Sequence, residues 1–450
     1  MATQFLFVDQ GAQHDRIAKR QIRQHVMKGK NAGRKIKRPS RLDIVSHGKE
    51  QKQWYPGAAD ETFSIAFQLV GLPVEVSPQS LRVIHEFFHF TTERMYPMQL
   101  GLSLDDSKRM WLKLFFADTE TFECNLAMMQ AANETYLGRG ETSPRALTNL
   151  AKTFARVQQR ILSPDALADS TVTIVISLVN QEHLRGDLSG ATIHIAGLRR
   201  MVELRGGLDQ LEHNPPLLMK ICKMDLVYAL QYGGQTAFFR DNLAEVRQTL
   251  RRQGCAMDRE EAAAMVRHPE SDLGGALREV LVDALSLGHL FNQDRGAGSV
   301  GLFAFQEIFL SIGFRLLRTC PMDGPPLVSP LRATCHTGLL LFAMSIFLRH
   351  DSKSVLDCTL ATQRLKDTLA RTICDEASEW RLWLMMMGAI WTLGDDQVAA
   401  WLRPMLSETA SYLRLTTWTE ARARLQRFPW INKLHDQPGR EVWDQLRGNV

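Results

Sequence analysis

Helix-start signals recur along the chain, and they constrain its fold more than any other feature. Ser-Pro pairs stand at 77–78, 143–144 and 163–164, and each precedes a run with apolar residues at helical spacing. Serine can accept hydrogen bonds from the free N–H groups of a first turn, and proline fits that turn because it needs no donor there. No alternation of strand and helix patterns accompanies these signals. The sequence therefore predicts an all-α fold of packed antiparallel helical hairpins.

The run TVTIVISLVN at 171–180 is β-branched and would indicate a strand if it stood alone. The Ser-Pro start before it and the polar QEHLR after it favour a helix instead. The predicted helices cover 78–95, 104–117, 120–134, 144–161, 164–184, 190–205, 215–232, 241–253, 258–266, 273–289, 299–318, 330–350, 360–373, 376–392, 396–412, 416–427 and 440–447.

The stretch 183–211 contains a helix, predicted over 190–205, with a clear end. Gly206 and Gly207 are predicted to stop it, because glycine accepts the left-handed conformation that a C-terminal cap needs. Helical spacing places four apolar residues on one face, namely Ala191, Ile195, Leu198 and Val202.

Three arginines accompany this helix. Arg199 is four residues before Glu203, so the two are expected to form an ion pair on the solvent-facing side of the helix. Arg205 is expected to bond the carbonyls at the helix end. A structural role is preferred over ligand binding for these arginines and for Arg200.

Charge divides the chain into two domains. Residues 16–41 contain eleven Lys or Arg and no Asp or Glu, so this stretch carries a charge of +11. The whole chain carries +5, which leaves −6 for the remainder. We predict a basic, mostly disordered tail over 1–60 and a helical domain over 61–450. The tail's densest cluster is a candidate for nuclear import or for contact with DNA phosphates: Arg34, Lys35, Lys37 and Arg38.

Several stretches in this order resemble the fungal-specific transcription-factor domain, in the ascomycete branch that lacks an N-terminal binuclear zinc cluster. They are FLFVDQ at 5–10, RQHVMKGKNAGRK at 23–35, IHIAGLRRMVELRGGLDQL at 193–211, DLVYAL at 225–230, TAFF at 236–239, RLWLMMMGAIW at 381–391, TTWTEARARLQRFPW at 416–430, and Val442-Trp443.

The resemblance implies a transcription regulator or co-regulator in the nucleus, with a zinc-cluster transcription factor as a protein partner and a secondary-metabolite gene cluster as its target. The basic tail by itself predicts weak, non-specific contact with DNA, because its cations can contact phosphates without reading bases. The first alternative is a helical adaptor that makes no contact with DNA.

The second alternative, a zinc hydrolase, depends on one motif. His85 and His89 match HExxH, with Glu86 placed as the base. A third ligand is needed, and nothing distinguishes Glu120 or Glu123 on the next predicted helix for that role. We expect no metal, no cofactor and no enzymatic activity.

The seven cysteines offer no zinc site either, because no two of them are two residues apart as CxxC units require. Buried reduced thiols are expected. No signal peptide is expected, because no basic residues precede the first apolar run, FLFV, and that run is too short. No membrane span is expected, since the apolar run at 338–348 falls short of about 20 residues. The tryptophans and methionines within 380–391 have helical spacing and are expected in the core.

Overall fold

The computed structural model describes residues 76–88, 96–102, 105–137, 143–185, 187–252, 257–265, 273–293, 300–348, 359–371 and 378–447. All of them belong to one compact unit that spans 62–450. The predicted tail over 1–60 and its boundary with the helical domain lie outside the described residues, so both remain predictions.

The fold is all-α, as the sequence predicts, and no strand occurs in the described ranges. The elements, with η for 3-10 helices, are α4 (Pro78–Glu86), η3 (Met98–Leu100), α5 (Asp105–Phe115), α6 (Thr119–Leu137), α7 (Pro144–Ile161), η4 (Pro164–Leu167), α8 (Asp169–Arg185), α9 (Leu188–Leu204), η5 (Leu208–Leu211), α10 (Pro215–Tyr232), α11 (Leu243–Arg252), α12 (Arg259–Met265), α13 (Gly275–Asn292), α14 (Leu302–Thr319), α15 (Pro330–Phe347), α16 (Thr359–Arg371), α17 (Ser378–Trp391), α18 (Asp396–Tyr412), α19 (Trp418–Leu425) and α20 (Asn432–Arg447).

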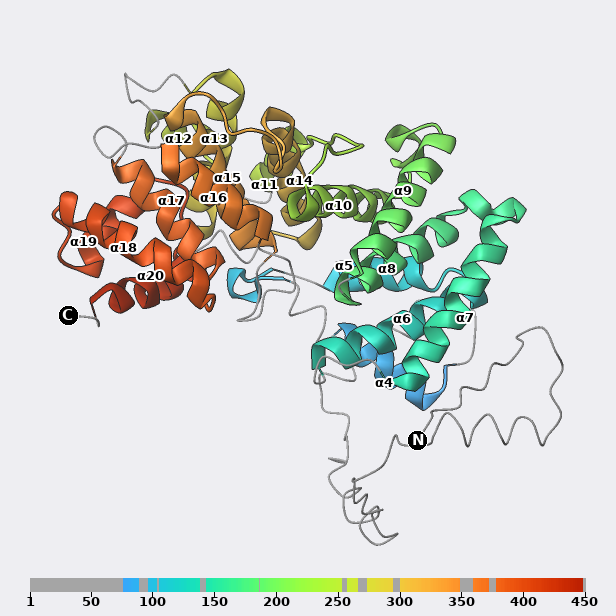
Figure 1. Ribbon diagram of the computed structural model, residues 1–450. Coiled ribbons are helices and arrows are strands. Elements are labelled where there is room, and N and C mark those ends of the chain that lie inside the picture. The colour runs from blue at the N-terminus through green and yellow to red at the C-terminus, as the bar shows by residue number, and fades with distance from the viewer. Residues whose placement is uncertain are drawn as a thin grey trace, which may run out of the picture. The chain divides into compact units, whose positions relative to one another are not determined.

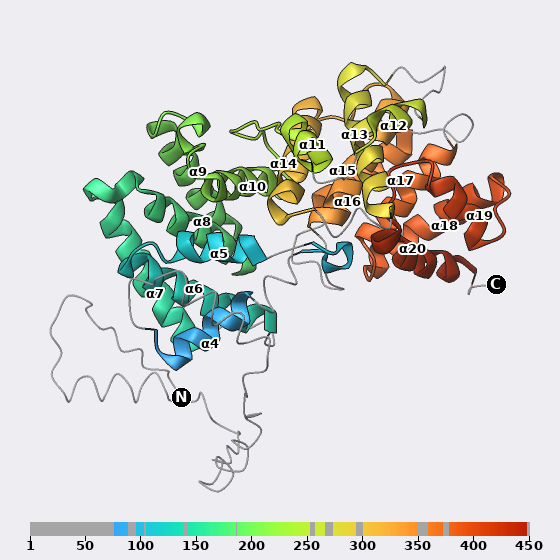
Figure 2. The same ribbon diagram turned by 180° about the vertical axis from the view of Figure 1, so that it is seen from behind.

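Helices that follow one another pack as hairpins, including α6 with α7, α8 with α9 and α17 with α18. In Figures 1 and 2, α4–α9 form one group and α11–α20 form another. Helix α10 packs against α5, α8 and α9 of the first group and against α14 and α16 of the second. It therefore joins the cores of the two groups.

Local capping explains why many predicted boundaries are correct. Ser77 and Ser143 each accept a hydrogen bond from a backbone N–H of the first turn that follows, and proline occupies that turn in both helices. The bounds of α7, α10 and α18 match the predicted ranges. The β-branched run at 171–180 is helical within α8, as predicted.

Most predicted helix ends lie within three residues of the observed ones, and two predicted helices differ more within the described residues. The range 164–184 is divided into η4 and α8, because Ala168 has extended backbone angles. Helix α20 begins at Asn432 rather than at 440, and Pro438 lies inside it. A side chain at Gly439 would come within 2.8 Å of Trp418 and 3.1 Å of Trp430, so this part of α20 is closely packed against tryptophans.

The predicted glycine stop after α9 is confirmed. Gly206 and Gly207 have φ angles of 95° and 97°, in the left-handed region. The Gly207 N–H donates to the Val202 carbonyl at 3.0 Å, and the Gly206 N–H donates to the Glu203 carbonyl at 3.0 Å. The two bonds satisfy carbonyls that the end of α9 would otherwise leave unpaired.

Alanine substitutions should distinguish the cost of a positive φ angle from the cost of a steric clash at this helix end. Gly207 has open space around its Cα, so Gly207→Ala should lower the stability by about 1 kcal/mol through its positive φ alone. Gly197 in α9 also faces open space but has ordinary helical geometry. Gly197→Ala should therefore raise the stability by about 0.5–1 kcal/mol.

Thermal and urea unfolding of the two variants beside the unmodified chain would measure these opposite signs. Equal stability of Gly207→Ala and the unmodified chain would contradict the role of Gly207 as a cap.

Candidate functional site

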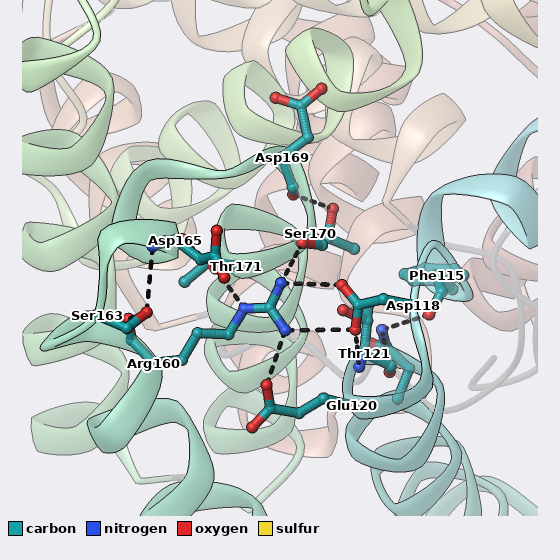
Figure 3. Close-up of polar contacts among 12 residues, drawn as sticks. Phe115, Asp118, Glu120, Thr121, Arg160, Ser163, Asp165, Asp169, Ser170 and Thr171 are labelled. Atoms are coloured by element: carbon teal, nitrogen blue, oxygen red, sulfur yellow. Dashed lines mark hydrogen bonds and ion pairs between the residues drawn. The ribbon is translucent and has the colours of Figure 1, made fainter. Parts of the chain in front are cut away.

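The guanidinium of Arg160 lies at the centre of a polar cluster between α6, α7 and α8 (Figure 3). It donates to Asp118 and to Glu120 at 2.9 Å each, to Thr171 Oγ1 at 2.7 Å and to Ser170 Oγ at 2.5 Å. Its side chain is only 9% exposed. Every nitrogen of the guanidinium has an acceptor, so the cluster fastens three helices together.

Asp118 also caps α6, because its Oδ1 accepts from the Thr121 N–H at 2.7 Å. Burial opposes ionisation of Asp118, but the hydrogen bonds from Arg160 and Thr121 outweigh it and lower the pKa to about 2. A carboxylate held so firmly in its charged form is suited to structure and not to proton transfer.

Asp283 on α13 is a second buried carboxylate and has no exposed surface. Three arginines surround it, with Nη–Oδ distances of 2.7 Å to Arg247, 3.1 Å to Arg259 and 2.8 Å to Arg315. Burial raises the pKa of Asp283 even though the arginines act to lower it. The arginines come from α11, α12 and α14, so this carboxylate ties four helices together.

Asp225 on α10 fixes the loop that follows the helix, residues 233–242. Its carboxylate accepts from Arg199 at 2.7 Å and from the backbone N–H groups of Ala237 and Phe238 at 3.1 and 3.0 Å. This arrangement corrects the predicted Arg199–Glu203 pair. Arg199 is drawn to Asp225 because a buried carboxylate needs a countercharge more than an exposed one does.

The other two arginines of this region are structural as well. Arg200 pairs with Glu203 at 3.1 Å, one turn away. Arg205 forms an ion pair with Asp169 at 2.6 Å, and not the predicted bonds to the end of its own helix. This pair joins the end of α9 to the start of α8.

The HExxH motif falls partly within the described residues. His85 is buried, and Glu86 forms an ion pair at 2.8 Å with the arginine one turn before it. Glu120 and Glu123, the two candidates for a third ligand, each form an ion pair with an arginine of α7. His89 lies outside the described residues. Among the side chains that the structure describes, no group of three His, Cys, Asp or Glu is arranged to hold a metal ion.

The predicted core residues of α17 are confirmed. Trp383, Trp391 and the methionines at 385–387 are fully buried, and Trp380 packs at the edge of the same core. Four cysteines are described, and all are free and buried, as predicted: Cys124, Cys222, Cys320 and Cys335. The predicted tail residues lie outside the described ranges: Arg34, Lys35, Lys37 and Arg38.

Two lysines of α10 form a cluster that the sequence analysis missed. The Nζ atom of Lys220 lies 4.8 Å from the ring centroid of Trp111 and 4.6 Å from that of Phe115. The Nζ atom of Lys223 lies 5.0 Å from the ring centroid of Tyr96. Tyr96 stacks on Trp111 at 5.9 Å, so the three rings form one continuous aromatic wall beneath two ammonium groups.

The electrostatics of this lysine–aromatic cluster differ from those of the carboxylates. Burial, and then the charge on Lys223, lowers the pKa of Lys220 to about 7. Burial lowers the pKa of Lys223 to about 8. Within the described part of the chain, neither lysine forms an ion pair with a carboxylate. Perturbed, partly exposed cations of this kind mark candidate binding sites.

Comparisons with known proteins add no relative. No family model, no curated protein and no solved structure matches the chain. A search of the described helices finds none that combines the length and the apolar character needed to cross a bilayer.

The arginine cluster around Asp283 gives a stability prediction. Asp283→Asn should lower the free energy of unfolding by about 3 kcal/mol, because it keeps the shape but removes a buried negative charge from three partly buried arginines, of which Arg259 retains Glu279 and Arg315 retains Asp241. Glu203→Gln is the control, since both partners of the Arg200–Glu203 pair are more than half exposed. That substitution should cost less than about 0.5 kcal/mol.

Urea unfolding followed by circular dichroism would measure both values. A small change in the free energy of unfolding for Asp283→Asn would mean that the three arginines do not need the Asp283 carboxylate for the fold to keep its stability.

Proposed function

We propose that the chain is a fungal transcription regulator or co-regulator that acts in the nucleus and serves a secondary-metabolite gene cluster. The observation that carries the proposal is the division of charge, with eleven cations in residues 16–41 and −6 on the remainder. The resemblance of several stretches to the fungal-specific transcription-factor domain supplies the biological setting. An all-helical body agrees with that setting but does not by itself distinguish it from others.

The charged clusters of the body support a role in binding over a role in catalysis. Arg160, Asp225 and Asp283 each hold two or more elements together through internal ion pairs. Groups used in this way are already paired with protein atoms and are not directed at a substrate. We therefore propose that the body is a scaffold that holds a protein partner, such as a zinc-cluster transcription factor.

A second candidate, an adaptor that makes no contact with DNA, is favoured by the exposed apolar side chains of α9. Ile193 and Leu204 are 67% and 55% exposed, and Ala196 and Gly197 lie exposed between them on the same face. Such a face suits contact with another protein. The acidic body would repel nucleic acid.

Import should depend on the cluster within the tail. Replacing Arg34, Lys35, Lys37 and Arg38 together with glutamine should spread a fluorescent fusion from the nucleus into the cytoplasm, because import receptors read clustered cations. Live-cell imaging measures the ratio of nuclear to cytoplasmic signal.

The matched control removes four other cations from the same tail, Arg16, Lys19, Arg20 and Arg23, and should leave the fusion nuclear. An unchanged nuclear signal in both variants would indicate import through a partner and contradict this prediction.

DNA binding by the purified chain should be weak and nearly independent of sequence. A tail that contacts phosphates reads no bases, and each phosphate contact makes the affinity fall further as salt rises. Selection from random duplexes at about 0.15 M salt should enrich no motif. Deleting residues 16–41 should abolish the residual binding.

An enriched motif would show that the chain itself contains a DNA-reading element. Chromatin association that survives the deletion would favour the adaptor.

A further inference from the structure

Lys220 and Lys223 are the starting point, because aromatic rings hold their ammonium groups and none of the carboxylates that the structure describes forms an ion pair with either lysine. They are three residues apart on α10 and both are half-buried. Helix α10 packs against α5, which supplies Trp111 and Phe115, while Tyr96 precedes η3. Two cations therefore share one side of α10 above a wall of aromatic rings.

The aromatic wall holds the ammonium groups without neutralising them. A ring face attracts a cation through its quadrupole, but it contributes no negative charge. The Tyr96 hydroxyl is occupied as well, since it accepts from the Gln306 side-chain amide at 2.7 Å. Asp225, two residues after Lys223 on α10, differs from the lysines. Its carboxylate accepts hydrogen bonds from Arg199 and from two backbone N–H groups.

We propose that Lys220 and Lys223 form a binding site for a small molecule that carries a phosphate group. Each ammonium has three N–H donors and can turn them toward a ligand on the solvent side. A phosphate group brings close to two negative charges and several acceptor oxygens at neutral pH, which matches two adjacent ammonium groups. Lysine binds phosphate as a compact point charge, whereas arginine is favoured where a planar, two-pronged contact to carboxylate or phosphate is needed.

The ligand is a free small molecule and not a nucleic acid, because of where the lysines lie. Lys220 is half-buried against α5 and Lys223 against Tyr96, so a compact anion can reach them more easily than a rigid duplex. The acidic remainder of the chain, at −6, would also repel a polyanion that extends over the surface. This site is independent of the proposed role in transcription.

A purely structural role for the lysines makes an opposite prediction. If they only covered apolar surface with their methylene stems, methionine would serve equally well. The unmodified chain should then bind no phosphate compound, and Lys220→Met and Lys223→Met should leave its stability unchanged. If the lysines are kept for a ligand, the same variants should be at least as stable as the unmodified chain but unable to bind it.

The test is calorimetric titration of the full chain with inorganic phosphate and with phenyl phosphate at low salt. We expect binding with a Kd in the millimolar range or tighter, weakened at least tenfold by Lys220→Met and by Lys223→Met. Lys366→Met is the matched control, because Lys366 lies 5.2 Å from the Trp401 ring but is exposed. It should bind as the unmodified chain does, and circular dichroism should show that all three variants are folded.

The proposal would be overturned if neither phosphate compound gave a binding heat at concentrations up to 10 mM. It would also be overturned if both methionine variants still bound the phosphates as the unmodified chain does. A phosphoserine peptide or a DNA duplex that binds at this site when the two small phosphates do not would overturn it as well. Failure of the import or DNA experiments would leave this result untouched, because they depend on the tail and not on α10.

Discussion

Burial of α10 is the constraint on which the rest of the structure depends. This helix contacts helices of both groups, and its apolar residues are covered on almost every side. Any charged group on such a helix must be compensated, since an isolated charge in a protein interior is strongly unfavourable. The three charges near its middle, Lys220, Lys223 and Asp225, show two different solutions. The carboxylate is paired, while the ammonium groups rest on aromatic rings.

Paired carboxylates recur across the body and link elements that are distant in the chain. Asp283 gathers arginines from three other helices, and Glu307 on α14 binds Arg240 from the loop after α10 at 2.7 Å. Buried ion pairs of this kind add little net stability, because desolvation offsets much of the attraction. They do penalise any other arrangement of the helices, since a slipped helix would leave a buried charge alone. The body is thus specified by charge as well as by apolar packing.

This organisation bears on function. The buried carboxylates that the structure describes pair with arginines of the same chain, which is the arrangement expected of the proposed scaffold. The lysine–aromatic cluster is the exception within the described residues. Because α10 also packs on α14 and α16, a ligand that stabilises the two ammonium groups would act on a helix shared by both groups. A small molecule bound there would have a direct physical route to the loop that Asp225 holds.

The sequence by itself determined the helical class and many helix ends, because those depend on residues within one turn of each other. The serine caps before α4 and α7 and the glycines at 206 and 207 act over three to five residues, so a local pattern predicts them. Tertiary structure decided the rest. It placed Pro438 inside α20, next to a glycine that packs closely against tryptophans, and it drew Arg199 to a carboxylate 26 residues away. It also brought Lys220 to the rings of α5, more than a hundred residues earlier, and no local pattern encodes a contact that only the packing of α10 on α5 creates.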